Sequence, residues 1–198
     1  MIDRTALAVF NQQFDDLLSI VSESNRRVTM DPIDQLFESY LNVFTKSYIV
    51  SACSILEAFI QDVLFAYVTV MEDRIIKLNV PRNIIMWPHG ETKKALYRFE
   101  AYKTGIEKDK IADEVSANFF KTIKVFEKIG IDLEGSEEFN RYSDFIGATV
   151  EKRNKIVHHN DEASDISLPD VIGIIKKFKE YTEAIFHIVE KSPHLSEL

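Results

Sequence analysis

The sequence is poor in cysteine, glycine and proline. Its 198 residues include one cysteine, Cys53, with six glycines and five prolines. A single cysteine excludes an intrachain disulfide and a cysteine-based zinc site. So few turn residues argue against a sheet-rich fold. A chain of this length buries roughly 70% of its unfolded surface, so we expect it to fold without a disulfide or a metal.

Positive charge is also scarce. The chain has 24 Lys and Arg against 32 Asp and Glu, which gives a formal net charge of -8. Non-specific nucleic-acid binding needs a basic surface, so this balance argues against it, and we expect no DNA partner. A small basic cleft on an acidic body stays compatible with the composition. Hydrophobic residues make up 45% of the chain, which is typical of globular rather than disordered proteins.

Long uncharged hydrophobic runs are missing. In the most apolar stretch, Glu57 and Asp62 leave uncharged runs only at 47–56 and 63–71. Both are shorter than the ~18 residues that cross a bilayer. The first sixteen residues contain acidic side chains, which is not typical of a signal peptide. We therefore expect a cytoplasmic protein with no membrane partner.

Apolar residues recur at helical spacing along most of the chain, which predicts an all-α bundle of five or six helices in one domain, 1–198. A connection or insertion occupies about 79–135. Two prolines and a glycine between 79 and 92 indicate a connection, in which Trp87 and His89 are interpreted as a loop anchored on the core. The predicted helices span about 3–24, 31–77, 92–103, 109–129, 136–157 and 168–191.

The second of these helices is expected at the centre of the bundle. The segment at 30–34 predicts its start, with Asp31 as N-cap and Pro32 in the first turn. Most of its sides are apolar, which is typical of a buried helix. One side carries a polar seam, which we interpret as close helix packing rather than a ligand channel. The seam comprises Ser47, Ser51, Ser54, Glu57 or Ala58, and Gln61. The last helix is expected to be capped by Ser167 or Asp165.

Residues 151–160, EKRNKIVHHN, contain the side chains with the clearest chemistry. Arg153 can grip a phosphate with two hydrogen bonds, and the imidazole of His158 can move a proton near neutral pH. On a helix, Asn154 and His158 share a face, whereas Arg153 and His158 lie about 140° apart. Only the reach of arginine, or unwinding of the helix end, would bring both to one ligand. A similar pattern at Arg82, Asn83 and His89 lies in the proline-flanked connection, where no rigid helix is expected.

The segment RNKIVHHND at 153–161, between two amphipathic helices, resembles the R-N-x3-H motif of the HEPN superfamily. SACSILEAFIQDVL at 51–64 is similar to the glutamate-bearing central helix of its stand-alone prokaryotic members. The resemblance implies a helical bundle that dimerises across the motif helices. It also implies a metal-independent endoribonuclease acting as a toxin or phage-defence effector, with an RNA substrate, no cofactor, and a cognate antitoxin as a further partner.

Site roles follow from the same resemblance. Arg153 would bind the scissile phosphate, and His158 would act as general acid or base while the RNA 2′-hydroxyl attacks. Asn154 would orient the pair, and Glu57 would hold Arg153 or His158 in place. His159 lies outside the motif and its role is open. No clustered His, Asp and Glu pattern indicates a metal site.

Four other interpretations stay open. Arg153 and His158 can be a pair of cations that satisfies the last carbonyls of a helix. Glu57 can be a half-buried carboxylate paired with any nearby cation. The chain as a whole can be a non-catalytic HEPN-like dimerisation and partner-binding module, or an unrelated helical scaffold with an accidental motif.

Overall fold

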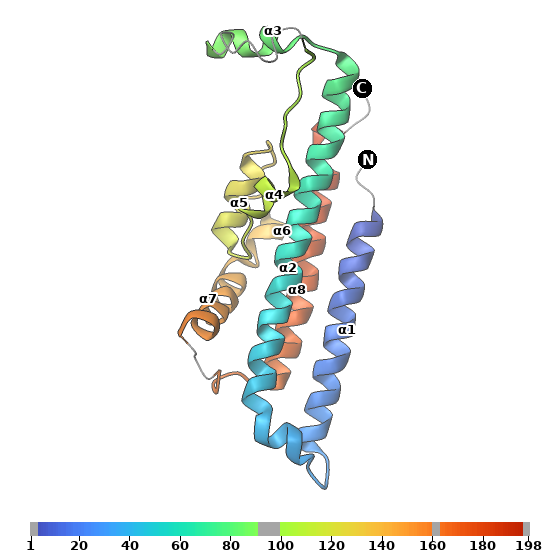
Figure 1. Cartoon of the computed structure of the whole chain (residues 1–198). Coiled ribbons are helices and arrows are strands. Elements are labelled where there is room, and N and C mark those ends of the chain that lie inside the picture. Colours follow the sequence, from blue (N-terminus) through green and yellow to red (C-terminus); the bar gives the residue numbers. More distant parts are fainter. Residues whose placement is uncertain (1–3, 91–99, 160–162, 196–198) are drawn as a thin grey trace.

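Three long helices lie side by side and form the body of the protein (Figure 1). The computed structural model describes residues 4–90, 100–159 and 163–195. Helix α1 (Arg4–Thr29) runs antiparallel to α2 (Gln35–Leu78) and to α8 (Leu168–Glu190). Within the described residues, the only β pairing is an isolated bridge between Pro81 and Ala101. The expected all-α fold is therefore confirmed.

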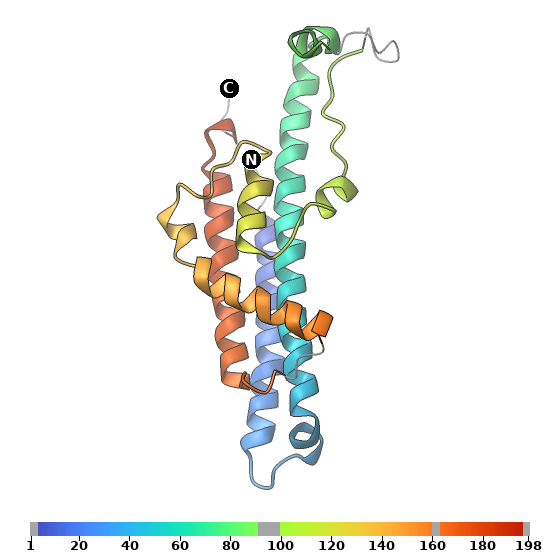
Figure 2. The ribbon, with the colours of Figure 1, turned by 90° about the vertical axis from the view of Figure 1, so that its left-hand side faces the viewer.

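Shorter helices cover one side of this body. Helix α7 (Ser143–His159) crosses in front of the three long helices at a steep angle (Figure 2). Helices α4 (Lys108–Ala112), α5 (Phe119–Glu127) and α6 (Glu137–Asn140) complete the layer. The C-terminal end of α2 projects beyond the body and carries α3 (Arg82–Met86) and the 3-10 helix η1 (Trp87–His89) at its tip, while η3 (Pro193–Leu195) follows α8. Helix α7 is thus the element that spans the outer layer.

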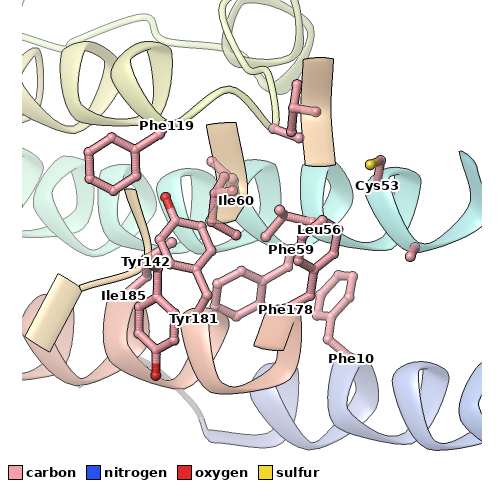
Figure 3. Close-up of a cluster of buried hydrophobic side chains, with 14 of the residues drawn as sticks. Phe10, Cys53, Leu56, Phe59, Ile60, Phe119, Tyr142, Phe178, Tyr181 and Ile185 are labelled. Carbon is pink, nitrogen blue, oxygen red and sulfur yellow. The ribbon is translucent and has the colours of Figure 1, made fainter. Parts of the chain in front are cut away.

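Aromatic rings fill the core between the helices (Figure 3). Phe10 of α1 meets Phe59 of α2 edge to face at 5.6 Å. Tyr181 of α8 contacts Phe139 at 5.2 Å and Tyr142 at 5.7 Å, which fastens the outer layer to the long helices. Such ring pairs add to the free energy of apolar burial. One continuous core therefore runs through both layers.

The start of α2 differs from the prediction. The N-cap is Asp34, whose carboxylate accepts a hydrogen bond from the Leu36 N–H at 3.0 Å. Asp31 and Pro32 lie before the helix and are joined by a cis peptide bond. The prediction was wrong because two aspartates with similar capping chemistry stand three residues apart. Helix α2 ends at Asn79, which adopts a left-handed conformation with φ 49°.

Most of the polar seam of α2 faces outward instead of packing against another helix of the described residues. Ser47, Ser51, Ser54 and Ala58 are exposed, so they form an outer face of the helix. The interpretation as close helix packing was wrong for these residues. On its other sides α2 buries twelve residues against α1, α7 and α8. By length and composition alone α2 is apolar enough to cross a membrane, and 44% of its most apolar window is buried within the protein.

Two predicted helices are each divided in two. The helix expected at 109–129 is split into α4 and α5, because Asn118 caps a new helix by accepting a hydrogen bond from the Lys121 N–H. The helix expected at 136–157 is split into α6, capped by Ser136, and α7. Apolar spacing continues across both breaks, so the pattern did not show them.

The connection at 79–92 is more regular than expected, since it contains α3 and η1. Trp87 is 76% exposed at the tip of the projecting end, so its interpretation as a core anchor was wrong. Of the helix expected at 92–103, residues 92–99 lie outside the described part of the chain, and residues 100–103 are not helical. Ser167 caps α8, as one of the two alternatives proposed.

Candidate active site

Arg153 lies where α7 crosses the central helix α2. Its Nη2 contacts Oε2 of Glu57 at 3.4 Å, and its Nη1 donates to Oδ1 of Asn154 at 3.1 Å. The side chains of Arg153 and Glu57 are 23% and 30% exposed. The Nε of Arg153 is buried and has no hydrogen-bond partner among the described residues. The guanidinium is therefore held in place while part of its donor capacity is unused.

Glu57 connects three parts of the chain. While Oε2 meets Arg153, Oε1 accepts a hydrogen bond from the backbone N–H of Ala117 at 3.2 Å. Ala117 belongs to the segment that leads into α5, so the carboxylate ties α2 both to α7 and to the start of α5. The sequence analysis named Glu57 but missed Ala117. Every residue except proline has a backbone N–H, so the residue type of Ala117 gives no sign that this group donates to Glu57.

His158 and Asn154 lie on the exposed surface of α7, near its C-terminal end. In the part of the chain that the structure describes, no hydrogen bond or ion pair joins His158 to Arg153. Five residues of regular helix place the two side chains about 140° apart around the axis. The structure thus brings Arg153, Asn154 and Glu57 together, but leaves His158 and His159 facing solvent.

The floor of the site holds the single cysteine. Cys53 lies one helical turn before Glu57 on α2 and is fully buried. Burial raises the pKa of its thiol to about 12, while the nearby charge of Arg153 opposes the increase and that of Glu57 adds to it. A thiol with so high a pKa stays protonated at neutral pH, so it does not serve as a nucleophile.

The lysines beside Arg153 are engaged with carboxylates. Lys152 pairs with Asp165, and Lys155 pairs with Glu151 one turn earlier on α7 at 2.8 Å. The second Arg–Asn–His pattern lies elsewhere, on α3 and η1 at the projecting end of α2. Over residues 4–90, 100–159 and 163–195, no three His, Cys, Asp or Glu side chains gather as metal ligands.

Comparison with protein-family models identifies the family of this chain. The family model described as RiboL-PSP-HEPN matches residues 10–191, which includes α2, α7 and the whole candidate site. Searches of curated proteins and of solved structures found no match. The match extends over most of the chain and agrees with the all-α architecture, so the expected HEPN membership is confirmed. This chain belongs to the RiboL-PSP-HEPN family.

Proposed function

We propose that this protein is a metal-independent endoribonuclease, acting in the cytoplasm as a toxin or phage-defence effector. The observation on which the proposal depends is the anchoring of Arg153 on Glu57 in a chain of the HEPN family. A carboxylate from the central helix fixes the guanidinium, while the Arg153 side chain stays 23% exposed and so can still meet an anion. A phosphodiester is the anion that a planar arginine fork fits best in RNA.

The proposed reaction uses the 2′-hydroxyl of RNA as nucleophile. His158 removes the hydroxyl proton, the 2′ oxygen attacks phosphorus, and the bond from phosphorus to the 5′ oxygen breaks. The products are a 2′,3′-cyclic phosphate and a 5′-hydroxyl, which receives a proton from a general acid. Arg153 stabilises the charge on the phosphoryl oxygens, and Asn154 orients the guanidinium through its Oδ1.

A homodimer would complete this site. Because Arg153 and His158 of one chain point in different directions, the arginine of one copy can meet the histidine of a second copy across a two-fold axis. Helix α2 presents an exposed face without charged side chains. This face includes the exposed residues of the polar seam and borders Glu57. Uncharged residues on an exposed helix face favour a protein contact over a solvated surface. The face comprises Val43, Ser47, Ser51, Ser54 and Ala58, which all follow the kink of α2 at Tyr40.

Mixing two inactive variants tests the shared site. Arg153→Ala and His158→Ala, each inactive alone, are unfolded, combined and refolded so that subunits exchange. In a mixed dimer, one of the two sites keeps both side chains, so about one quarter of the wild-type cleavage activity should return. No recovery, with mixed dimers shown by mass spectrometry, would mean that Arg153 and His158 act within one chain or do not act together.

Chelation tests the absence of a metal. Cleavage of a total RNA preparation should continue in EDTA and should leave cyclic phosphate ends. Loss of cleavage in EDTA with recovery on adding Mg²⁺ would contradict the proposed mechanism. Wild-type protein that cleaves none of the RNAs offered would contradict the function itself.

The second candidate is a non-catalytic HEPN-like module that dimerises and binds a partner such as a cognate antitoxin protein. The separation of His158 from Arg153 within one chain favours it. Under this alternative, the purified protein binds its partner tightly without cutting RNA, and Arg153→Ala leaves partner binding unchanged. The cleavage and mixing experiments distinguish the two candidates.

A further inference from the structure

The projecting end of α2 is apolar and has no acidic side chain (Figure 1). Residues 75–90 run from the last turn of α2 through α3 and η1, and they contain no Asp or Glu in a chain that has 32 of them. Their cations are Lys77 and Arg82. We call residues 75–90 the tip. Five of its large apolar side chains are 38–76% exposed: Ile76, Leu78, Ile84, Ile85 and Trp87.

The opposite end of α2 is also apolar but carries the opposite charge. Residues 28–45 include the turn after α1 and the first turns of α2, and we call them the base. They contain Asp31, Asp34 and Glu38 but no Lys or Arg. Asp34 caps α2 and pairs with Arg27, whereas Asp31 and Glu38 are exposed. Six large apolar side chains of the base are 37–57% exposed: Met30, Ile33, Leu36, Tyr40, Leu41 and Val43.

The tip and the base complement each other. Apolar side chains that cluster on a surface mark a site of interaction, whereas single ones are ordinary. Lys77 and Arg82 give the tip a formal charge of +2, and three carboxylates give the base a charge of -3. Contact of a tip with a base is therefore favoured over contact of two tips or two bases. A helix of 44 residues is about 66 Å long, so a tip can reach only the base of another copy.

A two-fold axis across the middle of α2 would make two such contacts at once. Two copies of α2 then lie antiparallel, and each tip meets the base of the other copy. Lys77 and Glu38 are equally far in sequence from the point between Glu57 and Ala58, so an axis at this point brings them together. Ser54 and Ala58 are exposed there, and such small side chains let two helices approach closely.

We propose that the tip of one copy docks on the base of a second copy of this chain, with Lys77 against Glu38. The proposal rests on the homodimer that the proposed function requires, but it does not depend on RNA cleavage. Burial of the exposed apolar side chains supplies the free energy of association. The charges select the antiparallel orientation, because a parallel pair would place like charges together at both ends.

Charge reversal on each side tests the contact. In a homodimer, Lys77→Glu or Glu38→Lys alone places like charges at both contacts, so the dissociation constant should rise at least about tenfold. In an equal mixture of the two variants, every contact of a mixed dimer joins opposite charges, and association should approach that of the wild type. Analytical ultracentrifugation at low salt measures association. Lys176→Glu and Glu183→Lys, exposed on α8, are the matched controls and should dimerise like the wild type.

The single tryptophan of the chain gives an independent measurement. Trp87 is 76% exposed in one copy, so its emission reports whether the tip is in water or covered. On dilution of the wild type, the emission should shift to longer wavelength over the concentrations at which the dimer dissociates. Lys77→Glu should already show the long-wavelength emission where the wild type is dimeric, and circular dichroism checks that both fold.

The results separate the contact from the enzyme. Dimers whose affinity neither Lys77→Glu nor Glu38→Lys changes would overturn the contact between tip and base, and would leave the nuclease function standing. A mixture that associates no better than each variant alone would also overturn it. A monomeric wild type that binds anionic lipid vesicles through the tip would assign the tip to a membrane surface instead. Charge-dependent dimers without any RNA cleavage would support the contact and contradict only the nuclease function.

Discussion

Arg153 of α7 contacts Glu57 of α2, which stands 96 positions earlier in the chain, at 3.4 Å. The contact joins the motif helix to the central helix of the bundle. It also fixes which way the guanidinium faces, since Asn154 holds Nη1 on the other side. The position of the candidate site thus depends on the packing of α7 across α2, rather than on the motif segment alone.

Replacing Arg153 with lysine should abolish most of the RNA cleavage. Lysine keeps the charge but cannot make the two parallel hydrogen bonds of a guanidinium, and we expect a loss of at least about 100-fold in kcat/KM. Single-turnover cleavage of a fluorescent RNA measures the loss. Full activity in Arg153→Lys would show that a single positive charge is sufficient and that the two parallel hydrogen bonds of the guanidinium have no role in cleavage.

His158→Ala should lower cleavage by about 10²- to 10⁴-fold, as expected for loss of a general acid or base. His158 is exposed, so the free energy of unfolding should change by less than about 0.5 kcal/mol. The neighbouring His159 is exposed as well and serves as the matched control. If His159→Ala reduces cleavage as much as His158→Ala, the assignment of the proton-transfer role to His158 is wrong.

Glu57→Gln tests the anchoring of Arg153. Glutamine keeps the size of the side chain and an acceptor for the Ala117 N–H, but removes the charge that faces the guanidinium. We expect about a tenfold decrease in kcat with little change in KM, because the arginine is less well oriented in the transition state. Glu57→Ala should lose more activity and also some stability, because it leaves the N–H of Ala117 without its acceptor. Wild-type kcat in both variants would assign Glu57 a purely structural role.

The capping box at the start of α8 should make stability depend on pH in acid. The side chain and backbone N–H of Ser167 donate to Asp170 Oδ2 at 2.6 and 2.9 Å, and these bonds hold the pKa of Asp170 below its usual value of 3.8. Because the folded-state pKa is the lower one, this stabilisation is complete above pH 4 or so and disappears as pH falls through the folded-state pKa.

Ser167→Ala should lower the free energy of unfolding by about 1 kcal/mol at neutral pH. The stability difference between the wild type and Asp170→Asn should shrink below about pH 4. Urea unfolding at a series of pH values measures both effects. A difference that stays constant down to pH 2 would show that the carboxylate of Asp170 does not contribute through its charge.

The sequence by itself determined the class of fold and the location of the motif. Apolar spacing near 3.6 residues is a local property, so it indicated the long helices α1, α2 and α8, and capping chemistry narrowed the start of α8 to Ser167 or Asp165. The breaks before α5 and α7 escaped prediction, because apolar residues continue in phase across them, although Asn118 starts α5 and residues 141–142 separate α6 from α7. Trp87 was misplaced for a similar reason, since its apolar character predicts burial whereas α2 carries it beyond the body.

Only the tertiary structure decided how the motif is used. The contact of Arg153 with Glu57 and the bond from Ala117 to Glu57 each join residues far apart in the chain. Such contacts depend on the angle at which α7 crosses the long helices, which is set by the packing of side chains such as Tyr142 against Tyr181. Residue spacing contains no information on that angle, because it describes each helix separately and not the way two helices pack.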